Sequence, residues 1–315
     1  MNILMPSAGR KYLLAGMLRE ALDARGGRLF ASDASPFASG LVPAHEKVDL
    51  PRFDAPDFWS AASALLAQKA IDAVIPVRDA ELAGWAEAFE AGRIKTRVFA
   101  SPSSTLLTCY DKWELIKLAT RFNIPCPRTI PALPGSAPPE EDFYPVVVKP
   151  RSGAGARGVA IAHSRPMLEA LLLEAEGEVL IQRLVEGVEF TVDCYATAEG
   201  ALKAAVVRKR VAVVGGQSDV GQTVYDEELT SLCRRLASQL KFRGPINIQF
   251  IRGREGPQLI DVNPRFAGAV AISRAAGANL AEWTVADLYG EAPVFPESYS
   301  LVTWLGYADG VVRKT

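Results

Sequence analysis

The stretch that decides the fold is Gln258-Leu-Ile-Asp-Val-Asn-Pro-Arg-Phe-Ala-Gly268. As a strand it would place Asp261, Asn263 and Arg265 on one face and Ile260 and Val262 in the core, because strand side chains alternate. A carboxylate and an amide oxygen two residues apart are ligands that Mg2+ prefers, and the guanidinium that follows can contact a phosphoryl oxygen. The stretch predicts a phosphoryl-transfer site, with an ordinary strand ending in an Asn-Pro turn as the alternative.

A second polar and apolar alternation precedes this stretch. Pro245-Ile-Asn-Ile-Gln-Phe-Ile251 is separated from it by a turn at Gly253 to Gly256, so the two strands are predicted to form an antiparallel hairpin. That hairpin would set Gln249 beside Asp261 and Asn263. Three oxygen ligands are therefore predicted to converge.

Composition places the chain among globular proteins of about two domains. Its 315 residues are 49% hydrophobic, and 35 Lys and Arg against 36 Asp and Glu give a net charge of -1. The chain lacks the positive charge of a general nucleic-acid binder. The amino terminus has no basic segment before its apolar run, so we expect no signal peptide; no apolar run is long enough for a membrane span, and we expect a cytoplasmic protein without nucleic-acid or membrane partners. The four scattered cysteines are expected to be reduced and structural.

The first hundred residues alternate between strands and helices. Strands are expected at Asn2 to Pro6, Leu29 to Ser32, near Val48, Ala73 to Val77 and Val98 to Ala100. Helices are expected after Arg10 (with the apolar stripe Leu13, Leu14, Met17, Leu18, Ala21 and Leu22), from Asp57 to Gln68 and from Asp79 to Phe89. This alternation predicts a doubly wound parallel sheet that binds ligands at the carboxyl ends of its strands.

Several polar residues fall at those carboxyl ends: Ser7, Gly9, Arg10, Asp33, Asp79 and Glu81. We interpret Arg10, Asp79 and Glu81 as candidate contacts with a second substrate. For Asp79 and Glu81 the alternative is that they only favour a helix N-terminus, where negative charge is welcome. Ser-Ala-Gly-Arg does not match the dinucleotide fingerprint.

Two lysines and a glycine-rich loop indicate phosphate binding. Asp111 and Glu114 are typical of a capping box, which places Lys112 at a helix start, where an anion is also favoured. Lys149 interrupts an apolar strand, and a buried ammonium needs an anionic partner. In the loop from Arg151 to Gly158, small residues let backbone amides approach phosphate oxygens, although a plain turn is the alternative.

Two further strands carry polar side chains on one face. Val188, Phe190, Val192 and Cys194 are expected to face the core, with Glu189, Thr191 and Asp193 on the opposite side. Arg208 and Arg210 share one face of the strand from Val206 to Val214. A bound anion and a solvated edge explain that arginine pair equally well.

The order of these features resembles the ATP-grasp superfamily. A lysine that opens a helix is followed by Val-Val-Lys-Pro, the glycine-rich loop, Gln-Arg-Leu-Val-Glu-Gly-x-Glu, an arginine-containing strand, Gln-Phe and Asp-Val-Asn-Pro-Arg. The resemblance covers essentially the whole chain. Gln249 and Asn-Pro-Arg are most similar to the synthetase halves of carbamoyl phosphate synthetase large chains, of which this chain looks like a stand-alone relative.

The resemblance implies an α/β fold, α+β in its C-terminal part. A Rossmann-like pre-ATP-grasp domain would span residues 1–108, followed by a two-lobed ATP-grasp fold with a lid subdomain at 109–183 and a C-terminal subdomain with the metal site at 184–315. ATP and Mg2+ would be the cofactors, with Mn2+ as an alternative ion. A homodimer is left open as the assembly.

The resemblance also implies residue roles. Lys112 and Lys149 would contact ATP phosphates under a lid loop that includes Ser152, Gly153, Gly155, Arg157 and Gly158. Gln182, Arg183 and Val185 would line the adenine pocket, and Glu189 would hold the ribose. Gln249, Asp261 and Asn263 would bind Mg2+. Arg210 and Arg208 would lie near the phosphates, and Arg265 would stabilise the transferring phosphoryl group together with Arg210.

Family chemistry implies a ligase that joins a small-molecule carboxylate, with an amino acid as one candidate, to an amine or similar nucleophile through an acylphosphate. Two departures matter: Asp261 stands where the family usually has Glu, and Gln249 where most of its ligases have an acid. One carboxylate binds free Mg2+ weakly, so ATP oxygens would have to complete the site. A carboxylate or carbamate kinase and a nucleotide-binding module without turnover are the alternatives.

Overall fold

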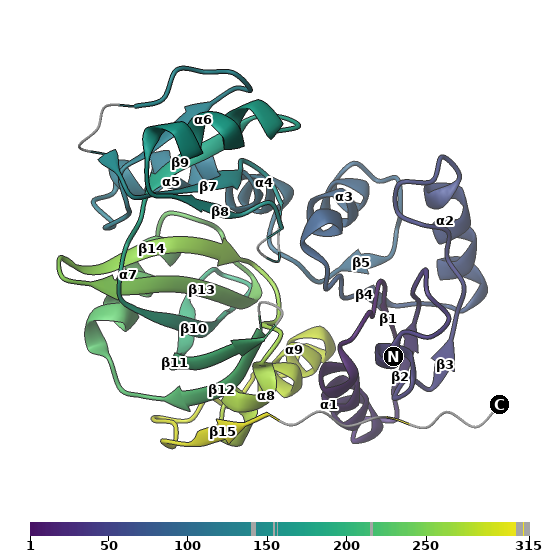
Figure 1. The fold of residues 1–315 in the computed structure, drawn as a ribbon. Coiled ribbons are helices and arrows are strands. Elements are labelled where there is room, and N and C mark those ends of the chain that lie inside the picture. The colour runs from purple at the N-terminus through teal and green to yellow at the C-terminus, as the bar shows by residue number, and fades with distance from the viewer. Residues whose placement is uncertain (140–142, 154, 156, 215–216, 307–310, 312–315) are drawn as a thin grey trace.

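A computed structural model describes residues 1–315 except 140–142, 154, 156, 215–216, 307–310 and 312–315. Three sheets organise the described residues (Figure 1). We call them the parallel sheet (β1 to β5), the small sheet (β6 to β9) and the large sheet (β10 to β15). In Figure 1 the small sheet lies above the large sheet and the parallel sheet lies to their right. The predicted mixed α/β class is confirmed.

The parallel sheet confirms the predicted doubly wound unit. Its strands have the order β3-β2-β1-β4-β5 and pair in parallel. They are β1 (Asn2–Met5), β2 (Arg28–Ala31), β3 (Glu46–Lys47), β4 (Ala73–Val74) and β5 (Arg97–Val98), connected by α1 (Tyr12–Asp23), the short 3-10 helix η1 (Ser39–Leu41), α2 (Phe58–Gln68) and α3 (Asp79–Glu90).

Helices cover both faces of the parallel sheet. Ile3 and Met5 pack with α1, whereas Leu4 and Phe30 pack with α2 and α3. Both faces of the strands are therefore buried, as is usual in parallel sheets. The predicted stripe on α1 was wrong at Leu13, which is 53% exposed because the buried face runs through Leu14, Ala15, Leu18 and Leu22.

The small sheet is antiparallel, with the order β6-β9-β7-β8. Its strands are β6 (Thr129–Ala132), β7 (Val146–Pro150), β8 (Ala160–Ala162) and β9 (Val179–Arg183), and α6 (Arg165–Glu174) packs on it through Leu168 and Leu172. Two helices precede the sheet, α4 (Ser103–Tyr110) and α5 (Lys112–Arg121). The sequence pattern did not predict α4. Leu115 and Ala119 of α5 join the core of the large sheet.

The large sheet has the order β14-β13-β10-β11-β12-β15 and is antiparallel throughout. Its strands are β10 (Val188–Ala196), β11 (Leu202–Val214), β12 (Gln217–Thr223), β13 (Gly244–Gly253), β14 (Gly256–Asn263) and β15 (Thr303–Leu305). On one face, Phe190, Val192 and Cys194 pack against α7 (Glu227–Ala237), as predicted. The prediction was wrong for Val188, which is 39% exposed at the strand start.

Part of the opposite face of the large sheet packs against α8 (Val270–Ala275) and α9 (Leu280–Tyr289). Tyr195 and Val206 of this face share a core with Val270, Trp283 and the buried face of α1. This core joins the large sheet to the parallel sheet. None of the helices in the described ranges is long and apolar enough to cross a membrane.

Side chains define the ends of several helices. Asp111, Asp226 and Asn279 accept hydrogen bonds from backbone N–H groups in the first turns of α5, α7 and α9. These acceptors satisfy donors that a helix start leaves unpaired. Helix α9 ends at Gly290, whose φ of 75° lies in the left-handed region that favours glycine.

The predicted hairpin of β13 and β14 is confirmed, with a bulge that strict alternation did not predict. Gln249 pairs with Asp261 and Phe250 with Leu259, which leaves Ile260 as the extra residue. Leu259 and Val262 are buried in the core, whereas Ile260 is only half-buried. The core position predicted for Ile260 was therefore wrong.

Candidate functional site

One face of the large sheet carries a row of polar side chains from four neighbouring strands. In register, Asp261 pairs with Gln249, Gln249 with Thr191, and Thr191 with Arg208. Residues in register on neighbouring strands point to the same side of a sheet. The row therefore brings together four residue types that suit an anionic or metal-containing ligand.

A second polar row lies directly beside the first. Asn263 pairs with Asn247, and Asn247 with Asp193. All three side chains are buried. The predicted ligands Gln249, Asp261 and Asn263 thus lie on one face, as the alternation indicated. Thr191, Asn247 and Asp193 extend that face, and the sequence analysis had assigned them no role in the site.

The predicted metal ligands form a site with one carboxylate. The Asn263 Nδ2 donates to Asp261 Oδ2 at 3.4 Å, and Lys112 Nζ lies 3.9 Å from Asp261 Oδ1. Within the described ranges, no three His, Cys, Asp or Glu side chains come together as a metal-binding group. The donors are thus a carboxylate and two amide groups. Hard oxygen donors of this kind fit Mg2+, provided that a ligand supplies further oxygens.

Lys149 extends from β7 of the small sheet toward this face. Its side chain is buried, and Nζ donates to Gln182 Oε1 at 3.0 Å and to the carbonyl oxygen of Ile260, in the bulge, at 3.5 Å. Burial lowers the pKa of Lys149 to about 8, whereas the negative charge of Asp261 acts in the opposite direction. These hydrogen bonds go to neutral oxygens, so Lys149 still has capacity for an anion.

Lys112 is the first residue of α5 and confirms the predicted helix start. Asp111 caps the helix by accepting from the N–H groups of Trp113 and Glu114. The capping box itself was wrong, because the Asp111 N–H donates to Leu107 and the Glu114 side chain pairs with Lys117 and Arg151. Lys112 Nζ donates to the carbonyl oxygen of Gly153 at 2.6 Å, which ties the helix to the glycine-rich loop.

The glycine-rich loop projects from the small sheet. Gly153 and Gly155 have φ values of 135° and 72°, where only glycine is unstrained, and a Cβ at either position would meet open space. Glycine is therefore required by the backbone conformation and not by packing. Ser152, Arg157 and Gly158 are exposed. Ala154 and Ala156 of the predicted lid loop lie outside the described residues.

The residues predicted to line the adenine pocket surround the connection from β9 to β10. Gln182 is buried and also donates from Nε2 to Thr129 Oγ1 at 2.8 Å. Arg183 is exposed and Val185 is half-buried. Glu189, the predicted ribose ligand, forms an ion pair with Arg210. The structure thus brings Glu189 and Arg210 together, while their roles remain predictions.

Arg208 meets an internal anion. Its guanidinium is buried and binds both carboxylate oxygens of Asp193, at 2.8 and 2.9 Å. The solvated-edge interpretation is wrong for this residue. The position of Arg208 beside the phosphates stays a prediction.

Arg265 connects the large sheet to the parallel sheet. Its Nε and Nη2 donate to the Asp79 carboxylate at 2.9 and 2.8 Å, and Nη2 also donates to Asn263 Oδ1 at 3.3 Å. Asp79 is the first residue of α3, so it also suits the helix N-terminus. A predicted phosphoryl-transfer residue and a predicted substrate residue therefore form one ion pair.

The other polar residues at the carboxyl edge of the parallel sheet also gather. Glu81 is buried and accepts from Ser7 Oγ at 2.7 Å and Arg78 Nη1 at 2.9 Å. Asp33 accepts from the Gly9 N–H at 2.7 Å. These side chains border a cavity of about 270 Å³, whose lining includes Ser7, Asp33, Arg52, Arg78 and Glu81. Arg10 is exposed.

Lys11 is a further cation at this edge that the sequence analysis missed. Burial lowers its pKa, and the positive charge of Arg265 lowers it further, whereas Asp79 raises it. Lys11 thus lies close enough to the Arg265–Asp79 pair for both charges to act on it. Its position in the loop after β1, next to Arg10, could have indicated it from the sequence.

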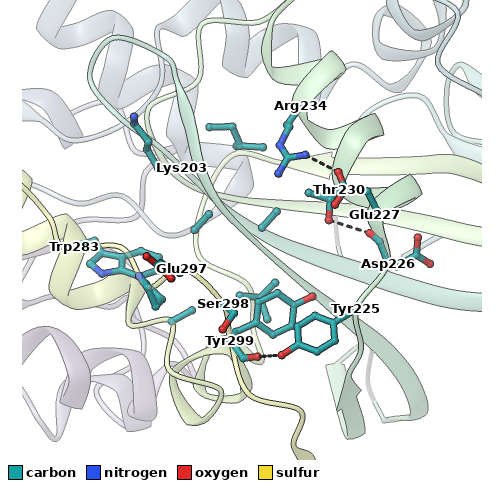
Figure 2. A pocket seen from close by; sticks show the side chains of 16 residues that line it. Lys203, Tyr225, Asp226, Glu227, Thr230, Arg234, Trp283, Glu297, Ser298 and Tyr299 are labelled. Atoms are coloured by element: carbon teal, nitrogen blue, oxygen red, sulfur yellow. Dashed lines mark hydrogen bonds and ion pairs between the residues drawn. The ribbon is translucent and has the colours of Figure 1, made fainter.

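A separate cavity of about 320 Å³ lies along β11, α7 and α9 (Figure 2). Lys203, Trp283 and Tyr299 contribute to its lining, and its Arg234 is paired with Glu227 at 2.7 Å. No predicted site residue lines this cavity. The candidate site is therefore the polar face beneath Lys149.

Two family models match parts of this chain. Residues 175–305 match the family model described as "ATP-grasp in the biosynthetic pathway with Ter operon", and residues 3–96 match "PylC-like, N-terminal domain".

Three solved structures illustrate the likeness in fold. The L-amino acid ligase from Bacillus licheniformis is 17% identical, with a TM-score of 0.74 over 91% of this chain and 74% of that one. Biotin carboxylase from Campylobacter jejuni is 17% identical, with a TM-score of 0.76 over 95% and 73%. The ADP complex of N5-carboxyaminoimidazole synthetase from Staphylococcus aureus is 14% identical, with a TM-score of 0.77 over 95% and 79%.

Proposed function

Because the chain is an ATP-grasp protein, we propose that it is an ATP- and Mg2+-dependent ligase that joins a small-molecule carboxylate to an amine or similar nucleophile. The observation that carries the proposal is the polar face of the large sheet. It combines Gln249, Asp261 and Asn263 with the Glu189–Arg210 pair, under Lys149 of the small sheet. Phosphoryl transfer needs this combination of positioning and charge neutralisation.

The proposed reaction has two steps. A carboxylate oxygen of the acid bonds to the γ-phosphorus of ATP, and the bond from that phosphorus to the bridging oxygen breaks, which releases ADP. The nucleophile's nitrogen then bonds to the acyl carbon, inorganic phosphate leaves, and the nitrogen loses a proton. Lys149 and Lys112 would hold phosphate oxygens, Gln249, Asp261 and Asn263 would hold Mg2+, and Arg265 would neutralise charge on the transferring phosphoryl group.

The acceptor acid is proposed to bind between Arg265 and the carboxyl edge of the parallel sheet. Open α/β sheets bind ligands at this edge. Arg265 already reaches Asp79 there, and Lys11 adds a cation without an ion pair among the described residues. Among proteins of similar fold, the Bacillus licheniformis protein is an L-amino acid ligase, which makes amino acids the first acids to test.

A paired screen tests the proposed ligase. Acids, beginning with the amino acids, are mixed with amines and MgATP, and ADP release is measured together with the mass of the product. The expected result is ADP release that requires both partners and yields a condensed product. ADP release with the acid alone would support a carboxylate kinase instead. ATP binding without turnover against any pair would support a nucleotide-binding module.

Asp79→Asn is expected to slow ADP release by about tenfold with the acid and amine found by the screen. The amide keeps only one acceptor oxygen for the two N–H donors of Arg265, and charge-assisted pairs contribute about 1.5–3 kcal/mol. ATP affinity should change little, since Asp79 contacts the arginine and not the lysines. Initial rates and ATP titrations measure the two effects. Asp57→Asn, at an exposed position without a capping hydrogen bond, is the control. Equal rates for Asp79→Asn and the wild type would show that this ion pair does not position Arg265 for catalysis.

A further inference from the structure

A buried carboxylate at the end of the polar rows joins four elements of the fold. Asp193 of β10 is 1% exposed and accepts from Arg208 of β11, from Asn247 Nδ2 of β13 at 2.8 Å and from Ser273 Oγ of α8 at 2.5 Å. Two further strands and a helix are thus fixed relative to one side chain.

Two of these donors lead to the predicted metal ligands. Asn247 pairs in register with Asn263 and lies two residues before Gln249 on the same strand. Because its Nδ2 donates to Asp193, the Asn247 amide has a fixed orientation. Ser273 belongs to the helix that follows the turn at Asn263, Pro264 and Arg265. Asp193 therefore constrains both the strand and the turn that carry the site.

Stability alone does not explain this cluster. Replacing a buried ion pair with apolar residues of similar volume is often neutral or stabilising, because desolvation offsets the attraction. Arg208 Nη1 is buried without a hydrogen-bond partner in the described part of the chain. An unsatisfied buried donor costs about 1–3 kcal/mol. The cluster is understandable if the orientation of its partners matters more than the energy of the pair.

We propose that Asp193 is a positioning residue for the metal-ligand face. Its carboxylate holds Asn247, Arg208 and Ser273 so that Gln249, Asp261 and Asn263 keep the arrangement that binds ATP together with Mg2+. The role rests on the proposed function, because it assumes the Mg2+-ATP site on this face. Partners that orient metal ligands without touching the metal typically change metal affinity by about 10- to 100-fold when they are mutated.

The test separates positioning from stability. The double variant Asp193→Leu with Arg208→Met removes both buried charges and leaves apolar side chains. Urea unfolding measures its stability, and titration calorimetry measures ATP affinity with Mg2+ and with EDTA. We expect the double variant to fold and to unfold at a urea concentration modestly below that of the wild type, because removal of the buried charges offsets part of the cost of leaving Asn247 Nδ2 and Ser273 Oγ without their acceptor. The ratio of ATP affinity with Mg2+ to that with EDTA should fall about tenfold or more.

Two further variants complete the experiment. Arg252 lies over Phe190 on the α7 side of the large sheet and forms an ion pair with Asp226. Arg252→Met removes this ion pair and should leave the ratio of ATP affinity with Mg2+ to that with EDTA unchanged. Ser273→Ala removes one donor to Asp193 and keeps the ion pair, so it should lower the ratio in the same direction by a smaller factor. If the double variant does not fold, Ser273→Ala alone tests the role of Asp193.

The outcomes distinguish this proposal from the proposed function. A folded double variant, or Ser273→Ala, with the Mg2+ ratio of the wild type would overturn the role of Asp193 and leave the ligase proposal standing. A wild-type protein whose ATP affinity does not depend on Mg2+ would overturn the proposed site and the role of Asp193 with it.

Discussion

Asp261→Asn is expected to lower ADP release by about 100-fold or more, because a metal ion at a transferring phosphoryl group contributes several kcal/mol and each 1.36 kcal/mol is a factor of ten in rate. Asp261 is the single carboxylate among the predicted ligands, so the variant retains only amide oxygens. ATP affinity should also lose its dependence on Mg2+. Initial rates of ADP release at several Mg2+ concentrations, with the pair found by the screen, measure the effect.

Two controls bracket this result. Asp49→Asn removes a carboxylate that is 92% exposed beside Lys47 and should leave the rate unchanged. Asp261→Glu keeps the charge and should retain turnover at a higher Mg2+ requirement, since the longer side chain shifts the oxygens. An Asp261→Asn variant that turns over at the wild-type rate would place the metal elsewhere.

The placement of Gln249, Asp261 and Asn263 on one face could be predicted from local sequence, because their geometry is local. The short turn at Gly253 to Gly256 sets the register of β13 and β14, and strand alternation then places Gln249, Asp261 and Asn263 on one side. The bulge at Ile260 was not predicted. An extra residue breaks the two-residue alternation of the strand, and no glycine or proline marks the position.

The contacts between distant segments could not be predicted in this way. Arg265 and Asp79 are separated by 186 residues, and both were candidates, yet no sequence pattern indicated that they would pair. Asp193 and Arg208 lie on adjacent strands. From the sequence, however, Arg208 and Arg210 could equally have faced solvent. Ser273 of α8 donates to the Asp193 carboxylate, and this contact comes from a distant part of the chain that the strand pattern does not reveal. The parallel sheet, with its repeated alternation of strand and helix, was the easiest part to predict.

Lys149→Met is expected to weaken ATP binding by about 10- to 100-fold, because charge-assisted hydrogen bonds contribute about 1.5–3 kcal/mol. The same change should stabilise the fold. The pKa of Lys149 is lowered from 10.5 to about 8, and at 1.36 kcal/mol per unit this difference corresponds to about 3 kcal/mol spent on burying the charge at pH 7. Opposite effects on affinity and stability would identify a lysine retained for ligand binding.

The pH dependence of stability provides a second test of the prediction for Lys149. Between pH 8 and 10.5 the folded protein releases the Lys149 proton while the unfolded chain keeps it, so the contribution of Lys149 to the free energy of unfolding rises with pH in the wild type. Lys149→Met lacks this rise, and its stability advantage should therefore shrink across that range. Wild-type ATP affinity should decline as pH passes 8, because the phosphates bind the ammonium form. Urea unfolding and ATP titrations at several pH values measure both trends.

The matched control for Lys149 is Lys117→Met, on the exposed side of α5. Lys117 pairs with Glu114 and is 49% exposed, so its loss should change neither ATP affinity nor the pH dependence of unfolding. If Lys149→Met bound ATP as tightly as this control, Lys149 would not contact the phosphates. The oxygens of Gln182 and Ile260 would then remain the partners of Lys149 when ATP binds, and β7 would contribute no cation to the site. Reduced affinity in Lys149→Met alone, with greater stability, would locate the phosphates between the two sheets.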